Sequence, residues 1–253
     1  MRQGFVRILW GDFLDENNLR LSELEKQYDF KFQKDNKVLT RRFKIEQDIK
    51  TSLGCKFRIP CVSYVFGEQN YKQLVDMGCE AVLIHKDPYK YHPIRGLYKH
   101  KLDAYQYIMK DFDEIVYLDW DINLNQELPD NFWNCLNKKE VFQAALGRYK
   151  KARLNHRLQP DGNHWCPMGA FVYMRDKKIP DRLVELNTGA NAWSCEPSFA
   201  KLTDEITGGW QGVNRYFDLF EPDFYISKNS PYKNTSQYKK DNICFDMSLG
   251  VPL

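Results

Sequence analysis

The sequence predicts an α/β fold, with a central and mostly parallel β-sheet flanked by helices. In the first half of the chain, short apolar segments rich in β-branched and aromatic residues alternate with segments of helical periodicity. The run at 115–118 is apolar at every position, as in a strand that is buried on both faces. Hydrophobic residues make up 43% of the chain and aromatic residues 15%, which is enough for a substantial core.

The composition limits the classes of function. At 253 residues the chain is long enough for one large α/β domain, and we expect a single domain over 1–253. The net charge is +3 with 28% charged residues, which gives no overall reason to expect a nucleic-acid ligand. There is no apolar run of membrane-spanning length and no signal-peptide pattern, and the seven cysteines are scattered without a C-x-x-C pair. These features predict a cytoplasmic protein with reduced thiols and without structural zinc.

Strands and helices alternate along the first half of the chain. Residues 5–10 predict a first strand, and the highly charged region 15–58 is most simply read as containing a surface helix. The segment 61–66 predicts a second strand, which is followed by a helix that ends at Gly78 and by a third strand at 81–85. A strand, a helix and a strand within about 25 residues predict a right-handed crossover, and therefore a parallel sheet.

A pair of acidic residues follows the next strand. The segment 98–112 has helical periodicity, and the strand at 115–118 leads directly into Asp119-Trp120-Asp121. Ligands of open α/β sheets bind beyond the carboxyl ends of the strands, where two carboxylates need a counter-charge. Asp119 and Asp121 are therefore candidate ligands for Mg or Mn that holds a nucleotide diphosphate, the alternative being a plain strand-end turn.

Two other turns contain acidic residues. A second D-x-D pair, Asp111 and Asp113, lies between the predicted helix and the strand, and we interpret it as a solvated loop. Trp10, Gly11 and Asp12 end the first strand and are candidate contacts of a nucleotide. Glycine allows a ligand to approach the backbone closely and Asp12 can accept hydrogen bonds from a base or a ribose, although a plain turn explains the same residues.

The motif K-H-K-L-D-A-Y at 99–105, followed by D-E-I-V-Y-L-D-W-D at 113–121, resembles the nucleotide-binding half of the GT-A glycosyltransferases. The resemblance extends over roughly 4–225 and is strongest between 60 and 125. It implies a GT-A (Rossmann-like) fold with three parts: a nucleotide-binding half over about 1–125, a sugar and acceptor half over about 126–225, and a C-terminal tail or lid over about 226–253.

The resemblance also implies roles for single residues. Asp121 would bind the metal directly, Asp119 would contact the metal or the donor ribose, and Trp120 would belong to the same donor site. Lys99 or Lys101 would lie near the nucleotide phosphates, whereas without the resemblance these lysines are read as solvated helix ends.

The second half begins with a short packing helix and a strand at 141–147. A basic and aromatic segment follows, which is either a mobile loop that engages an anionic acceptor or an ordinary surface loop. Within it, Trp165 is a candidate sugar or acceptor contact. His156 and His164 are candidate metal ligands, although a lone histidine in a loop usually does not bind a metal.

The segment M-G-A-F-V-Y-M-R at 168–175 resembles the family's strand whose small residues form the floor of the sugar pocket. Gly169 and Ala170 fit that role because a larger side chain would block the sugar, and a strand start without a ligand is the alternative. An amphipathic helix at 178–187 is expected to be structural.

The region 193–210 is the second candidate for chemistry. Ser194 and Pro197 suit the start of a helix, which puts Glu196 in the first turn. By resemblance, inverting enzymes of the family use an acidic residue here to deprotonate the acceptor hydroxyl, and a capping glutamate is the alternative. Asp204 and Glu205 are weaker acidic candidates that fit a surface position better. Three aromatic residues in or just after this region either stack on a sugar or belong to the core: Trp193, Trp210 and Tyr216.

The C-terminal tail is polar and basic, and we expect it to close over the diphosphate as a flexible lid. Many GT-A members carry a metal-binding histidine near the C-terminus, whereas this chain has no histidine after His164. Asp241, Asp246 or water would have to take its place, which leaves the metal dependence open.

The sequence as a whole predicts an enzyme that transfers a hexosyl or pentosyl group from a nucleotide sugar to an acceptor hydroxyl, with the help of Mn or Mg. The expected donor is a uridine diphosphate sugar, and the acceptor is a glycan, a lipid-linked sugar, a protein or modified DNA.

Two alternatives stay open. One is a nucleotidyltransferase, against which the lack of a glycine-rich, lysine-containing loop after the first strand counts. The other is a non-catalytic module that binds nucleic acid or protein through the basic loop 148–157.

Overall fold

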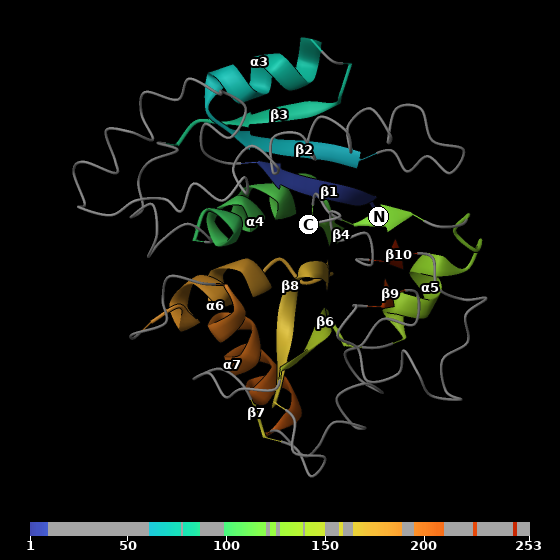
Figure 1. Ribbon diagram of the computed structural model, residues 1–253, viewed down its shortest axis with the longest axis vertical. Coiled ribbons are helices and arrows are strands. Elements are labelled where there is room, and N and C mark those ends of the chain that lie inside the picture. The colour runs from blue at the N-terminus through green and yellow to red at the C-terminus, as the bar shows by residue number, and fades with distance from the viewer. Residues whose placement is uncertain are drawn as a thin grey trace.

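The computed structural model describes the two sheets, five helices and some of their connections: residues 1–9, 61–76, 78–86, 99–119, 122–124, 127–138, 140–149, 157–158, 164–188, 195–209, 225–226 and 245–246. The larger sheet contains β1 (Gln3–Leu9), β2 (Cys61–Phe66), β3 (Ala81–Ile84), β4 (Glu114–Leu118), β6 (Phe142–Tyr149), β7 (Arg157–Leu158) and β8 (His164–Met174). The described helices are α3 (Glu68–Asp76), α4 (Lys99–Asp111), α5 (Phe132–Asn137), α6 (Ile179–Leu186) and α7 (Glu196–Thr207) (Figure 1).

The larger sheet has the strand order β3-β2-β1-β4-β8-β6, with β7 paired to β8. Strand β1 pairs in parallel with β2 and β4, and β2 pairs in parallel with β3. Strand β8 is antiparallel to both β4 and β6, so β6 runs in the same direction as the first four strands. The predicted fold class is therefore confirmed: the protein has an α/β, Rossmann-like fold with a central, mostly parallel sheet flanked by helices.

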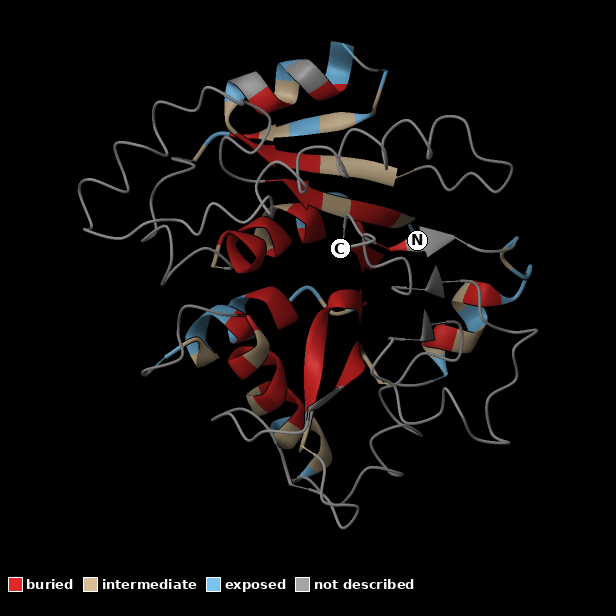
Figure 2. Ribbon diagram, viewed as in Figure 1, coloured by how far each residue is buried: buried red, intermediate tan, exposed pale blue. Residues whose placement is uncertain are grey.

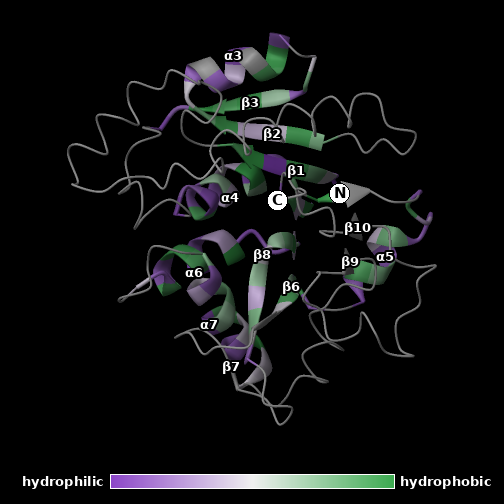
Figure 3. Cartoon of the chain, viewed as in Figure 1, coloured by the Kyte–Doolittle hydropathy of each residue, from purple (hydrophilic) through white to green (hydrophobic). Residues whose placement is uncertain are grey.

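Both faces of the central strands are apolar, as the unbroken hydrophobic run in β4 predicts. In β4, Ile115 and Tyr117 belong to the core that packs against α4, α6 and α7, whereas Val116 and Leu118 belong to a second core that packs against α5. Helix α3 covers the edge of the sheet through a third cluster around Leu74. Figure 2 shows the buried residues concentrated on the central strands and on the helices next to them, and Figure 3 shows hydrophilic and hydrophobic residues alternating along the helices.

Several elements follow the sequence closely. Helix α4 begins and ends within a residue of the predicted helix, and β2, α3 and β3 form the predicted parallel strand-helix-strand unit. The first strand begins at Gln3, two residues earlier than predicted. Gly78 has a φ of 80°, which is the left-handed conformation expected of a glycine that ends a helix.

Strands β6 and β8 are longer than the sequence predicts. Strand β6 continues to Tyr149, and β8 begins at His164, because the ends of the two strands pair with each other, Tyr149 opposite His164. Part of the predicted basic loop is therefore sheet, and β7 within it pairs with β8. The pairing between β6 and β8 is irregular: Ala144 lies opposite Val172, but the next residue, Ala145, lies opposite Met168. Such a bulge bends a strand and changes the direction of its side chains.

A small second sheet joins the C-terminal tail to the segment after the acidic motif. It contains β5 (Asn123–Leu124), β10 (Phe245–Asp246) and β9 (Tyr225–Ile226), in the order β5-β10-β9. The antiparallel register puts Phe245 opposite Leu124 and Asp246 opposite Asn123. A strand of the segment expected to be a lid is thus paired with residues that follow Asp121 by two positions. Among the described helices, none combines the length and the apolar character that crossing a membrane requires.

Candidate functional site

The site lies where the central strand β4 ends. Helix α4 connects two parallel strands, β3 and β4, and its first turn lies beside the carboxyl end of β4. The contact is direct: Nζ of Lys101 in the first turn lies 3.2 Å from Oδ1 of Asp119, the residue that follows the strand. Two predicted donor-site residues are therefore adjacent at the edge of the sheet where ligands of such folds bind.

Lys101 is buried, with only 1% of its surface exposed. Its Nζ donates a hydrogen bond to the carbonyl oxygen of Gly169 at 3.0 Å as well as to Asp119. It also lies 4.5 Å from the centre of the Tyr117 ring, a cation–π distance. A buried ammonium is expensive to desolvate unless it is paired, and these three partners, from β4, the residue after it and β8, offset that cost. The resemblance assigns Lys101 to phosphate binding, whereas the described contacts direct its ammonium into the protein.

Asp119 is only partly buried, with 23% of its side chain exposed. Its Oδ1 accepts hydrogen bonds from Lys101 and from the hydroxyl of Tyr117, while Oδ2 has no partner among the residues that the structure describes. The backbone is fixed as well, because its N–H donates to the carbonyl of Ala170 at 2.8 Å. The carboxylate is thus held through one oxygen and open through the other.

Gly169 is where β8 meets the start of α7. A Cβ added to Gly169 would lie 3.0 Å from Sγ of Cys195, 3.2 Å from Nζ of Lys101 and 3.4 Å from the ring of Phe199. The first two distances are tighter than a relaxed contact, so any larger residue here would push against side chains of the protein itself. The resemblance implies a different reason for the small residue, which is room for a bound sugar. Ala170 is buried as well, at 3% exposed.

Burial keeps the thiol and phenol groups of the site neutral. It raises the pKa of the Cys195 thiol to about 12 and raises the pKa values of Tyr105 and Tyr117 well above the usual range of tyrosine. The ring of Tyr105 meets that of Tyr117 edge to face, with centres 5.6 Å apart. Among the residues that the structure describes, the charges that act on Cys195 therefore come from Lys101, Asp119 and the neighbouring Glu196.

Glu196 is the first residue of α7 and is half-buried. The residue before it, Cys195, is the N-cap and makes no side-chain capping hydrogen bond, so the predicted cap at Ser194, which lies outside the described residues, is displaced by one position. At this position the helix dipole favours the negative charge of the Glu196 carboxylate. Because Cys195 packs against Gly169, the start of α7 lies next to the Lys101–Asp119 pair.

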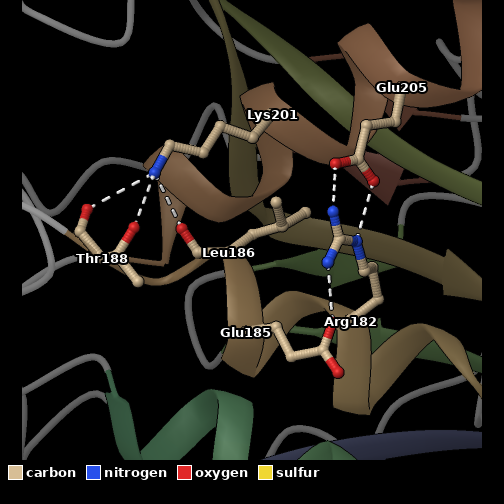
Figure 4. Close-up of polar contacts among 6 residues, drawn as sticks. All are labelled: Arg182, Glu185, Leu186, Thr188, Lys201 and Glu205. Carbon is tan, nitrogen blue, oxygen red and sulfur yellow. Dashed lines mark hydrogen bonds and ion pairs between the residues drawn. The ribbon is translucent and has the colours of Figure 1, made fainter.

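The other acidic candidates are placed elsewhere. Asp111 is the last residue of α4 rather than a loop residue, and it accepts a hydrogen bond from the Tyr64 hydroxyl at 2.6 Å. Asp113 accepts one from the backbone N–H of Arg2 and pairs with Lys177. Glu205 forms an exposed ion pair with Arg182 (Figure 4).

Several predicted site residues lie outside the described part of the chain: Trp10, Gly11, Asp12, Trp120, Asp121, His156, Trp193, Trp210, Tyr216 and Asp241. The backbone of Trp165 belongs to β8, and the structure describes nothing of its side chain. Sequence reasoning missed Tyr117 and Cys195. The period of a strand puts positions 117 and 119 on one face, which is a signal for Tyr117, whereas nothing local connects Cys195 to Gly169.

The described residues fit a cation only as part of a larger ligand set. Among them, no three histidine, cysteine or acidic side chains are grouped closely enough to hold a metal. Asp119 still offers Oδ2, a hard oxygen ligand. Mg is commonly held by one or two carboxylates together with substrate phosphates and water, so a single open carboxylate at this edge is compatible with such an ion. Lys101 already balances part of the charge of Asp119, so the need for a counter-charge does not by itself require a metal.

The comparisons with known proteins give weak likenesses of overall shape. No protein-family model and no curated protein matches the chain. Among solved structures, the chain is similar to apo mouse xyloside xylosyltransferase 1 at a TM-score of 0.42 and 8% identity, covering 99% of both chains. It is similar to the WbbM bifunctional glycosyltransferase at a TM-score of 0.46 and 10% identity, covering 99% of this chain and 46% of that one. It is also similar to a putative glucose-1-phosphate thymidylyltransferase from Bacillus anthracis at a TM-score of 0.41 and 10% identity, covering 83% of this chain and 86% of that one. Likenesses of this size decide no function.

Proposed function

We propose that the protein is a glycosyltransferase that takes a sugar from a nucleotide-sugar donor, a uridine diphosphate sugar, and transfers it to an acceptor hydroxyl. The observation that carries the proposal is the state of Asp119. Its carboxylate stands at the carboxyl end of the central strand with Oδ1 held by Lys101 and Tyr117 and with Oδ2 open. A carboxylate fixed in this way at the ligand-binding edge of an α/β sheet suits a diphosphate that arrives with a cation.

In this proposal Asp119, through Oδ2, and Asp121 hold the ion. A bound Mg or Mn would supply Lewis-acid stabilisation of the charge that develops on the departing diphosphate. Trp10, Gly11, Asp12 and Trp120 contribute to the nucleotide site, as the resemblance implies. The main chain of β8 at Gly169 and Ala170 forms the wall behind the sugar.

Glu196 is the proposed acid–base group. It is half-buried at the start of α7, beside the strand that carries Gly169, and Trp165 and Trp193 are the aromatic residues proposed to contact the sugar or acceptor. In an inverting reaction Glu196 would accept the proton of the acceptor hydroxyl as the new glycosidic bond forms. In a retaining reaction it would position the donor instead. The acceptor class is a glycan, a lipid-linked sugar, a protein or modified DNA.

The first experiment is calorimetric titration and thermal unfolding with UDP and UDP-sugars, with and without Mn. We expect UDP to bind more tightly when Mn is present, and a ligand at 100 times its dissociation constant adds about 2.7 kcal/mol of stability. Asp121→Asn should remove the Mn-dependent gain while the melting temperature of the free protein stays close to that of the wild type. Asp130→Asn, at an exposed position before α5, is the matched control and should behave as the wild type.

The proposal would be contradicted if the protein bound no nucleotide in these titrations. If it instead bound polyanions in a salt-sensitive way, the binding module would be favoured. A second variant separates the roles within the site: Glu196→Gln should slow transfer more than it weakens donor binding, because the amide cannot accept the proton. Unchanged transfer kinetics in Glu196→Gln would remove Glu196 from the mechanism.

A further inference from the structure

The ammonium group of Lys101 is enclosed by the protein. Its Nζ lies 3.0 Å from the carbonyl oxygen of Gly169, 3.2 Å from Oδ1 of Asp119 and 4.5 Å from the centre of the Tyr117 ring. Only 1% of the residue is exposed. An ammonium has three donors and no acceptor, so two of the three are directed at oxygens of the protein.

The same contacts orient the carboxylate. Lys101 and the Tyr117 hydroxyl both donate to Oδ1 of Asp119, and they approach it from α4 and from β4. Oδ2 makes no hydrogen bond within the described part of the chain. Two donors on one oxygen restrict the rotation of the carboxylate, and they leave its other oxygen at the partly exposed end of the strand.

Gly169 makes this arrangement possible. A Cβ at position 169 would lie 3.2 Å from Nζ, so a glycine leaves the lysine the room to reach both the carbonyl and the carboxylate without displacement. The site therefore depends on four residues from α4, β4 and β8 that fit together before any ligand binds.

We propose that Lys101 is a positioning residue for Asp119 and does not itself bind the donor phosphates. Together with Tyr117 and the Gly169 carbonyl it fixes the carboxylate with Oδ1 inward and Oδ2 outward, ready for a cation-bound nucleoside diphosphate. The inference rests on the proposed function, and it assigns Lys101 a different role from the phosphate contact that the sequence resemblance implies. Groups that orient a metal ligand in this way typically change metal affinity by about 10- to 100-fold when they are removed.

The test is calorimetric titration of UDP with Mn and, separately, with a chelator, in the wild type and in three variants. Lys101→Met keeps the aliphatic stem and removes the ammonium, and Tyr117→Phe removes only the hydroxyl. Lys110→Met makes the same chemical change at an exposed position of the same helix and is the control. We expect Lys101→Met to lose about tenfold or more of the Mn-dependent gain in UDP affinity, while its affinity in chelator stays within about threefold of the wild type. Tyr117→Phe should show a smaller loss of the same kind, and Lys110→Met should match the wild type.

The results separate the inference from the proposed function. A fall in UDP affinity of similar size with Mn and with chelator would mean that Lys101 contacts the phosphates, and it would overturn the inference while leaving the proposed function intact. An unchanged Mn-dependent gain in Lys101→Met would overturn it as well. If Lys101→Met does not fold, Tyr117→Phe decides, because loss of a single hydroxyl keeps the shape of the core. A wild type without a Mn-dependent gain would contradict the proposed function, and the inference with it.

Discussion

Gly169 lies where side chains from two helices converge on β8. Cys195 and Phe199 come from the start of α7 and Lys101 from the start of α4, and each would be within 3.4 Å of a Cβ at position 169. Small residues at ligand sites are often explained by the ligand. Here the protein's own side chains fill the space, so a larger residue at position 169 should destabilise the protein even when no ligand is bound.

Gly169→Ala should lower the free energy of unfolding by about 1–3 kcal/mol, because its methyl group overpacks the region between Sγ of Cys195 and Nζ of Lys101. The measurement is chemical denaturation without any ligand. In the double variant Gly169→Ala/Cys195→Ala the closest of these atoms is absent, so part of the loss should be regained relative to Cys195→Ala alone. If Gly169→Ala were as stable as the wild type, the packing explanation would be wrong.

Cys195 also gives the protein a pH dependence. Burial raises the pKa of its thiol from 9.0 to about 12. Above pH 9 the unfolded chain therefore releases a proton that the folded protein retains, so stability falls as the pH rises from about 9 to 12, by up to about 1.4 kcal/mol per pH unit from this group. Between about pH 8.5 and 10, near the lower end of this pH range, the free energy of unfolding of Cys195→Ala should decline less steeply than that of the wild type. Parallel curves would show that Cys195 does not contribute.

At the scale of elements, helices α6 and α7 pack side by side, and the start of α7 lies against β8. Arg182 of α6 donates two hydrogen bonds to Glu205 of α7 and one to Glu185, and Lys201 of α7 donates to the carbonyls of Leu186 and Thr188 at the end of α6 (Figure 4). The Arg182 and Glu205 side chains are 44% and 42% exposed, so water and salt screen this pair strongly. Leu183 on the inner face of α6 is fully buried.

Leu183→Ala should therefore destabilise the protein far more than Arg182→Gln does. The loss of a buried leucine side chain costs about 2–5 kcal/mol, whereas the exposed ion pair should contribute little and less still at high salt. Denaturation at low and at high salt measures both effects. Equal losses in the two variants would mean that the polar contacts, rather than the core, hold the two helices together.

At the scale of the whole molecule, a strand near the C-terminus, β10, pairs with β5, the strand that follows the acidic motif. The register of β10 puts Phe245 and Asp246 opposite Leu124 and Asn123, across more than a hundred intervening residues. Strand β10 belongs to the small sheet and not to the large one, so this described part of the tail pairs with the segment that follows the motif.

A chain that ends at residue 240 should therefore keep the large sheet but lose Mn-dependent UDP binding, because β5 is left without the strand that it pairs with in the described sheet. Circular dichroism and thermal unfolding report on the sheet, and titration reports on binding. A chain that ends at residue 248 retains β10 and serves as the control. Full binding by the shorter chain would show that residues 241–253, including β10, have no part in the donor site.

The sequence by itself determined the elements whose signals are local. The apolar run of β4, the period of α4 and the strand-helix-strand order of β2, α3 and β3 are each written in neighbouring residues, and all of them are observed. The sequence also identified Asp119 as the end of the central strand and Glu196 as the start of a helix, because strand ends and helix starts have local patterns.

Only the tertiary structure decided which of these residues meet. The hydrogen bond from Lys101 to Gly169 spans 68 positions, and the reason for a glycine at 169 depends on Cys195 and Lys101 together. The lengths of β6 and β8 and the pairing of β10 with β5 likewise depend on a partner strand distant in sequence. Local periodicity is fixed by the residues of one segment, whereas such contacts follow from the order of strands in the sheet and from the burial of several segments against one another. For that reason the sequence predicted a carboxylate at the edge of the sheet, and the folded chain alone showed what holds it there.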